Sequence, residues 1–232
     1  MGKTYEASMS IVEEIALRQS IRLGLLVVGL LAALIYAVSF CHRPPSVWKT
    51  LVKTIPMPAF AAAVAVSFGS WAVVVALLLS ALGDLALSRD GEKAFLVGLI
   101  SFAAAHVAYV VYFWDIGAGP LAVPVLLAAL VLFALSTERW LSPFAGDLRW
   151  PVRAYVVIIC AMGATAFGLV DRSLAVAGAV AFMASDTLLA IQLFRMKPDA
   201  SLQRMVSVAL WVLYAGGQFL IVAGVGWATP LF

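Results

Sequence analysis

The sequence is poor in charged residues. Asp, Glu, Lys and Arg make up only 12% of the 232 residues, whereas apolar residues make up 64%, and the mean hydropathy is +1.06. A water-soluble domain could not cover so much apolar surface with so few charges. We therefore expect the chain to be surrounded by lipid.

Cysteine and histidine are also scarce. Cys41 and Cys160 are expected at different depths of the membrane, so we do not expect a disulfide. His42 and His106 are too few for the three-histidine site of a metal-dependent membrane hydrolase, and we expect neither a metal nor another cofactor. The formal charge of +3 fits membrane orientation better than nucleic acid binding, for which the sequence gives no support.

The apolar residues gather in runs long enough to cross a bilayer, which takes about 20 residues. We count eight such runs: 21–40, 48–66, 69–88, 94–114, 120–136, 152–170, 174–195 and 205–227. The connections are short. The sequence therefore predicts an all-α polytopic membrane protein, a bundle of about eight transmembrane helices, with an extramembrane segment over residues 1–20 and one transmembrane domain over residues 21–232.

Basic residues predict the orientation of this bundle. Eight spans place both termini on one side, and most Lys and Arg residues then fall on the other side, which in membrane proteins is the cytoplasmic one. We expect a multi-pass protein of the bacterial inner (plasma) membrane with both termini outside. The residues expected on the cytoplasmic side are Arg43, Lys49, Lys53, Arg89, Lys93, Arg139, Arg149, Arg153, Arg195, Lys197 and Arg204.

Polar residues inside the runs are the functional signal, because ionisable groups within a membrane are costly and usually face a cavity or a partner. Asp84 lies near the end of the third run and Asp186 lies deeper in the seventh. The alternating direction of the runs brings both into the cytoplasmic half or near the midplane, where one shared cavity could open to the cytoplasmic side. The same cavity could include Lys53, His106, Tyr109, Tyr214 and Gln218.

Each of these residues also has a purely structural interpretation. Asp84 could be an interfacial carboxylate paired with Arg89 or Lys93, and Asp186 could pair with a Lys or Arg. Lys53 could extend to the interface. The remaining polar residues could hydrogen-bond between helices as packing groups: His106, Tyr109, Tyr214 and Gln218.

The order and spacing of many residues resemble those of the YhhN-like lysoplasmalogenase family of eight-span membrane proteins. The similar positions are Lys53-Thr54, Gly83-Asp84, Phe95, Gly98, Phe102, His106, Tyr109, Pro151-Val152, Tyr155, Met162, Gly178-Ala179, Phe182, Ser185-Asp186, Tyr214 and Gln218. The resemblance implies hydrolysis of the vinyl ether bond of lysoplasmalogens, which are lysophospholipids of the bilayer. The products would be a fatty aldehyde and glycerophosphocholine or glycerophosphoethanolamine.

Two carboxyl groups suffice for this chemistry, much as in glycoside hydrolysis. We expect Asp186 to donate a proton and Asp84 to be the ionised partner, with the reverse assignment open. His106 and Tyr109 could polarise water or bind the glycerol hydroxyl, and Arg89, Lys93 and Lys53 could meet the phosphate. The other residues expected at the substrate are Tyr214, Gln218 and Ser185.

Two other classes of protein use buried aspartates. An intramembrane aspartyl protease would have Gly two residues before the Gly-Asp pair, whereas this chain has Ala81-Leu82-Gly83-Asp84. A small membrane transporter or lipid-binding protein could use Asp84 and Asp186 for proton or cation coupling. Aspartates along an aqueous path would favour transport, and aspartates at a lipid-accessible pocket would favour the hydrolase.

Overall fold

The computed structural model describes residues 2–119, 122–197 and 201–227, with side chains described from Ser10 onward. Every regular element in this part of the chain is a helix. The helices are α1 (Gly2–Ile35), a π-helical turn (Tyr36–Phe40), α2 (Val47–Thr54), α3 (Pro56–Val66), α4 (Trp71–Ala86), α5 (Glu92–Ile116), α6 (Pro124–Trp140), two short 3₁₀ turns (Ser142–Phe144 and Gly146–Leu148), α7 (Arg149–Ala166), α8 (Ser173–Phe194) and α9 (Gln203–Val225). The all-α prediction is confirmed.

The helices α2 and α3 form one nearly continuous segment despite two prolines. The Ser46 side chain caps α2 by accepting a hydrogen bond from the Lys49 backbone N–H. Pro56 and Pro58 fall in the first turn of α3, where a missing N–H costs little. The backbone N–H of Ile55 still bonds to the Leu51 carbonyl, which joins the two helices.

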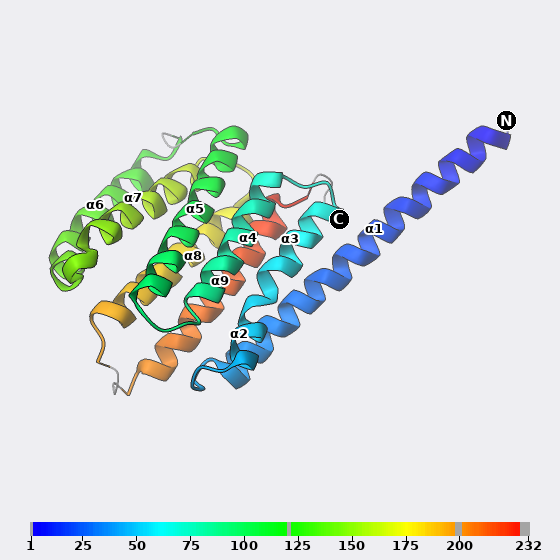
Figure 1. Cartoon of the computed structure of the whole chain (residues 1–232). Coiled ribbons are helices and arrows are strands. Elements are labelled where there is room, and N and C mark those ends of the chain that lie inside the picture. The colour runs from blue at the N-terminus through cyan, green and yellow to red at the C-terminus, as the bar shows by residue number, and fades with distance from the viewer. Residues whose placement is uncertain (1, 120–121, 198–200, 228–232) are drawn as a thin grey trace.

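The helices run alternately in opposite directions, so the loops gather at two ends of the bundle (Figure 1). We call the end that holds the start of α4 and the end of α9 the terminal end; there Tyr112 donates a hydrogen bond to the Val225 carbonyl (3.0 Å). We call the opposite end the basic end; there the Arg195 guanidinium lies 3.7 Å from the centre of the Phe144 ring. The first helix packs along one edge of the bundle and extends well beyond it.

Six segments in the described part of the chain are long and apolar enough to cross a membrane, which identifies an integral membrane protein. They are Ser10–Phe40, Val47–Val66, Glu92–Ile116, Pro124–Phe144, Ser173–Phe194 and Gln203–Val225. Helix α4 is apolar but shorter, and α7 carries Arg149 and Arg153 in its first turns. The eight expected runs thus correspond to eight helical segments, six of which are both long enough and apolar enough to span a membrane. Helix α1 starts at Gly2, so the expected extramembrane segment is helical and continuous with the first span.

Glycines set the closest helix contacts. A Cβ on Gly178 of α8 would lie 2.5 Å from the Gly217 carbonyl oxygen of α9, so only glycine permits this approach. Between α4 and α5, a Cβ on Gly83 would lie 2.6 Å from the Phe102 ring, and a Cβ on Gly98 would lie 2.7 Å from the Leu87 side chain. These contacts bring α4, α5, α8 and α9 together around the buried polar residues.

Candidate functional site

Asp84, near the end of α4, is held by a cation and a hydroxyl. Its Oδ1 lies 3.3 Å from the Lys53 Nζ of α2, and its Oδ2 accepts a hydrogen bond from the Tyr214 hydroxyl of α9 at 2.7 Å. Both partners are hydrogen-bond donors. A carboxylate that accepts hydrogen bonds from an ammonium group and a phenol is stabilised in its ionised form. We call Asp84, Lys53 and Tyr214 the ionised cluster.

The ionised cluster is almost closed to solvent. The Asp84 side chain is 2% exposed and that of Lys53 is 17% exposed. A buried charge needs a partner, and Lys53 is that partner. The structural interpretation in which Asp84 pairs with Arg89 or Lys93 is wrong: Arg89 instead donates to the Thr50 hydroxyl at 3.5 Å.

Asp186, in α8, faces a histidine instead of a Lys or Arg. Its Oδ2 lies 3.1 Å from His106 Nε2 of α5 and accepts a hydrogen bond from the Tyr155 hydroxyl of α7 at 3.1 Å. The His106 Nε2 has no well-aligned hydrogen-bond partner among the described residues, so its contact with Asp186 is close but poorly directed. We call Asp186, His106 and Tyr155 the histidine cluster.

The geometry of His106 determines where its protons lie. The Nδ1 atom is 2.7 Å from the Phe102 carbonyl oxygen, which can only accept, so Nδ1 carries a proton. The opposing Nε2 and Asp186 Oδ2 would repel each other if both were bare. A proton placed between them, on either the carboxyl or the imidazole, would make this contact attractive.

Aromatic rings connect the two clusters. The Phe182 ring lies 4.3 Å from the His106 ring and 5.5 Å from the Tyr214 ring, measured between centroids. The Phe102 ring lies 5.6 Å from Tyr214 and packs on Gly83, directly before Asp84. The two carboxyl groups thus lie on either side of a layer of aromatic rings and differ in their partners, which are Lys53 and Tyr214 for Asp84 and His106 and Tyr155 for Asp186.

A third polar network lies one helical turn further from the basic end. The Tyr109 hydroxyl donates to Gln218 Oε1 at 2.6 Å, and Gln218 Nε2 donates to the Ser80 hydroxyl at 2.9 Å. All three side chains are buried. This network links α4, α5 and α9 and supports the ionised cluster, since Ser80 and Gln218 each lie four residues from a cluster member. Ser185 is likewise engaged, donating to the Leu210 carbonyl of α9 at 3.0 Å.

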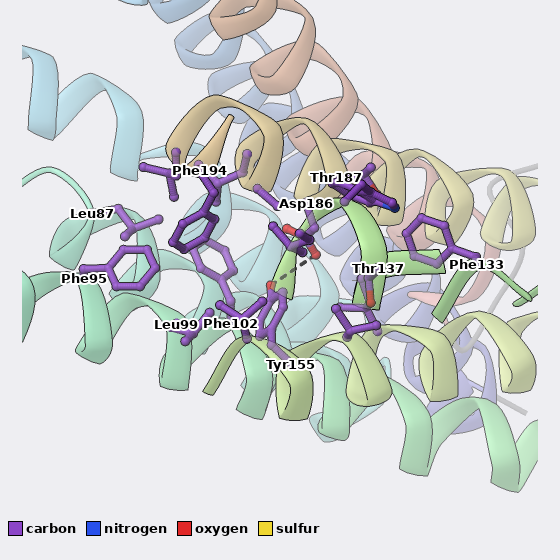
Figure 2. A pocket seen from close by; sticks show the side chains of 18 residues that line it. Leu87, Phe95, Leu99, Phe102, Phe133, Thr137, Tyr155, Asp186, Thr187 and Phe194 are labelled. Atoms are coloured by element: carbon purple, nitrogen blue, oxygen red, sulfur yellow. Dashed lines mark hydrogen bonds between the residues drawn. The ribbon is translucent and has the colours of Figure 1, made fainter. Parts of the chain in front are cut away.

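Asp186 and Tyr155 line a pocket between α5, α6, α7 and α8. We call it the apolar pocket because most of its 18 lining residues are aliphatic or aromatic. Figure 2 shows the hydrogen bond from Tyr155 to Asp186 inside it, with Leu87, Phe95 and Phe194 toward one side and Phe133 and Thr137 toward the other. A pocket with one carboxyl in a mostly apolar lining has room for an apolar group next to an ionisable one.

Two further pockets are both lined by Lys53. The basic pocket is lined by Tyr36, Pro45, Lys49, Thr50, Lys53, Leu87, Ser88 and Asp90. The connecting pocket is lined by Tyr36, Cys41, Lys53, Leu87, Leu189, Gln192, Leu193, Ser207, Leu210 and Trp211. Leu87 lines all three pockets. Instead of the single cavity expected from the sequence, the described residues form adjoining pockets, with Asp186 in one and Lys53 in the other two.

The structure also adds residues that the sequence did not single out. Tyr155 and Ser80 were not expected at the site, although Tyr155 is among the positions that resemble the family. Both are polar residues within apolar helices, which is the signal that selected Tyr109 and Gln218. Their partners lie on helices distant in sequence, so spacing along the chain gave no indication of their contacts.

Comparison with known protein families identifies a relationship for this chain. The sequence model of the YhhN family matches residues 48–225, which is most of the chain and includes every residue of both clusters. No curated protein and no solved structure matches the chain significantly.

Proposed function

The chain belongs to the YhhN family, and on that premise we propose that it is a lysoplasmalogenase-like membrane hydrolase. In this proposal it cleaves the vinyl ether bond of a lysoplasmalogen to a fatty aldehyde and glycerophosphocholine or glycerophosphoethanolamine. The family is associated with that activity. The alternative is a small membrane transporter or lipid-binding protein that uses Asp84 and Asp186 for proton or cation coupling.

The observation that carries the proposal is the contrast between the two carboxyl groups. Asp84 faces the Lys53 ammonium, whereas Asp186 faces the imidazole of His106, which can exchange a proton with it. Vinyl ether hydrolysis needs one group that gives up a proton and one that remains negative near the developing cation. Neighbouring carboxyl groups in different environments can take these two roles, as in glycosidases.

The reaction would proceed in two stages. The proton shared by Asp186 and His106 is transferred to the outer alkene carbon, and the π electrons form the new C–H bond. The adjacent carbon and the ether oxygen then share the positive charge, which the Asp84 carboxylate stabilises through space. Water adds to that carbon and returns a proton to Asp186 and His106. In the resulting hemiacetal the bond to the glycerol oxygen breaks, the hydroxyl oxygen loses its proton to become the aldehyde carbonyl, and the glycerol oxygen takes up a proton to become the alcohol.

The surrounding residues would support these steps. The Tyr155 hydroxyl holds the carboxyl of Asp186 in place, and the Phe102 carbonyl fixes the orientation of the His106 ring. This role for His106 replaces the direct contact with water or glycerol that the sequence suggested. Tyr109, Gln218 and Ser185 bond to protein groups and would act by positioning the helices.

The position of Asp186 favours hydrolysis over transport. An ion path would need polar groups on both sides of the carboxyl, yet Asp186 lines a mostly apolar pocket. We also propose that the basic end, near which the clusters lie, faces the cytoplasm and that the termini lie outside, because most Lys and Arg residues are at that end.

The test is aldehyde release from 1-alkenyl-glycerophosphocholine by the purified protein. We expect turnover by the wild type and a loss of at least about a hundredfold in Asp186→Asn and in Asp84→Asn, since acid–base groups typically contribute 10²–10⁴-fold. The matched control is Asp171→Asn. Asp171 is exposed at the terminal end, and Asn tolerates its positive φ of 66°.

Two results would contradict the proposal. Near-normal turnover by a well-folded Asp186→Asn protein would remove that carboxyl from the mechanism. Failure of the folded wild type to release aldehyde, with proton uptake into proteoliposomes that depends on both aspartates, would establish the transport alternative.

A further inference from the structure

The three pockets around the clusters meet at one side chain. Leu87 lines the apolar, connecting and basic pockets, while Leu189 and Leu193 of α8 form walls shared by the apolar and connecting pockets. Leu87 packs against Gly98, where any Cβ would approach its Cγ and Cδ2 to 2.7 Å. A ligand that passes Leu87 would enter the apolar pocket from one side and the two polar pockets from the other.

We propose that these pockets bind the two ends of a single-chain phospholipid that passes beside Leu87. Its hydrocarbon chain lies in the apolar pocket, its glycerol in the connecting pocket and its phosphate in the basic pocket. This inference rests on the proposed function, because it assigns the orientation in which that substrate is held.

The direction of the chemistry agrees with this orientation. In a vinyl ether the carbon that takes the proton is on the chain side, and the ether oxygen that shares the positive charge is on the glycerol side. Asp186 lines the chain side of the junction, and Lys53, bonded to Asp84, lines the glycerol and phosphate side. The opposite orientation would place the proton donor next to the glycerol and is unsuited to the reaction.

The basic pocket has the chemistry for a phosphate. Lys53 and Lys49 both line it, together with the Thr50 and Ser88 hydroxyls and one acidic residue, Asp90. The Lys49 ammonium donates to the carbonyls of Cys41 and Arg43, which leaves the third of its N–H groups for a ligand. The Thr50 and Ser88 hydroxyls already donate to the backbone carbonyls of Ser46 and Asp84, so the two lysines are the donors left for a phosphate.

The connecting pocket explains why the lipid has one chain. Its wall includes Lys53 and the hydrogen-bonded pair of Gln192 and Ser207, which are 2.7 Å apart. A free glycerol hydroxyl could hydrogen-bond to these groups, whereas a second acyl chain at that position would cover them without replacing their hydrogen bonds. The pockets therefore favour a lysophospholipid over a diacyl phospholipid.

Binding of uncleavable probes tests this orientation separately from catalysis. The probes are 1-alkyl-glycerophosphocholine, which lacks the reactive double bond, 1-alkylglycerol, which lacks the phosphate, and glycerophosphocholine, which lacks the chain. Each is titrated calorimetrically into the protein in phosphatidylcholine nanodiscs, with the alkyl probes at two chain lengths. We expect the intact lysolipid to bind most tightly, because both of its ends contribute.

One pair of variants tests the phosphate end. Lys49→Gln should weaken 1-alkyl-glycerophosphocholine about tenfold or more, as for loss of a charged hydrogen bond, and leave 1-alkylglycerol unchanged. The matched control, Lys197→Gln, removes an exposed charge from the same end and should change neither. Equal weakening of both probes by Lys49→Gln, or equal effects of the two variants, would overturn the phosphate assignment.

A second pair tests the chain end. Ala190→Leu adds volume to the wall of the apolar pocket and should weaken the longer alkyl probe more than the shorter one. The matched control, Ala129→Leu, lies on an exposed face of α6 and should weaken neither. An effect of Ala190→Leu that does not depend on chain length would overturn the chain assignment. If the binding pattern holds while vinyl ether turnover is absent, only the proposed reaction fails.

Discussion

The buried ion pair between Lys53 and Asp84 predicts unequal stability losses when either partner is removed. Lys53→Met leaves the Asp84 carboxylate, whose side chain is 2% exposed, without a counter-charge. Asp84→Asn leaves Lys53, which is 17% exposed and can extend its flexible side chain into the basic pocket. The lysine variant should therefore be the less stable of the two.

The separation of the pair gives the scale of the effect. At 3.3 Å and an effective dielectric constant of about 20, the attraction is about 5 kcal/mol, part of which is offset by desolvation. Loss of one partner of a buried pair typically costs about 3–5 kcal/mol. We expect the free energy of unfolding to fall by about 3 kcal/mol in Lys53→Met, by about 1.5 kcal/mol in Asp84→Asn and by about 2 kcal/mol in the double variant. The two single losses together exceed the loss in the double variant by about 2.5 kcal/mol, which is the coupling energy of the pair.

The assay is reversible unfolding by SDS in mixed micelles, followed by circular dichroism, for the wild type, both single variants and the double variant. Strong non-additivity, with the double variant more stable than Lys53→Met, is the expected result. Additive losses to within about 0.5 kcal/mol would refute the reasoning, because residues that do not interact show additivity of that quality.

Three further predictions concern the histidine cluster, the helix packing and the orientation. Tyr155→Phe removes the hydrogen bond to Asp186 and should lower kcat for aldehyde release about fivefold, for a bond worth about 1 kcal/mol; a loss as large as that of Asp186→Asn would instead make the phenol the proton donor. Gly178→Ala should lower the melting temperature because its Cβ would lie 2.5 Å from the Gly217 carbonyl oxygen. Gly216→Ala should leave the melting temperature unchanged because its Cβ would meet nothing within 4 Å, and equal melting temperatures of the two variants would contradict this packing. In a cysteine-free background and intact cells, a membrane-impermeant thiol reagent should label a cysteine in the α7–α8 loop and spare one in the α8–α9 loop, and the reverse pattern would invert the proposed orientation.

Much of the fold follows from the sequence because lipid imposes a simple rule. Apolar runs must form helices whose backbone hydrogen bonds are satisfied within the segment, so run length and position predict the helices well. The short connections then dictate alternating directions. The length of α1 was not predicted, because a helix can continue past an apolar run at little cost.

The candidate site was only partly predictable. The rarity of carboxylates in apolar runs pointed to Asp84 and Asp186, and no structure was needed for that inference. Partner choice depends on how the helices are rotated, which periodicity does not specify. The sequence therefore could not distinguish Lys53 from Arg89 as the partner of Asp84, and it did not indicate that His106 would face Asp186. The division into pockets depends on side chains such as Leu87, for which the sequence carried no signal.

The shortness of α4 has a mechanical consequence for the membrane. Its 16 residues cover about 24 Å at 1.5 Å per residue, about 6 Å less than a hydrocarbon core of roughly 30 Å. A bilayer around this helix must thin locally or let its interface dip toward the protein. Because Asp84 lies in the last turn of α4, the dip brings headgroups closer to the ionised cluster. Thicker membranes should raise the cost of this deformation, which would make the activity of the protein sensitive to the acyl-chain length of the lipids around it.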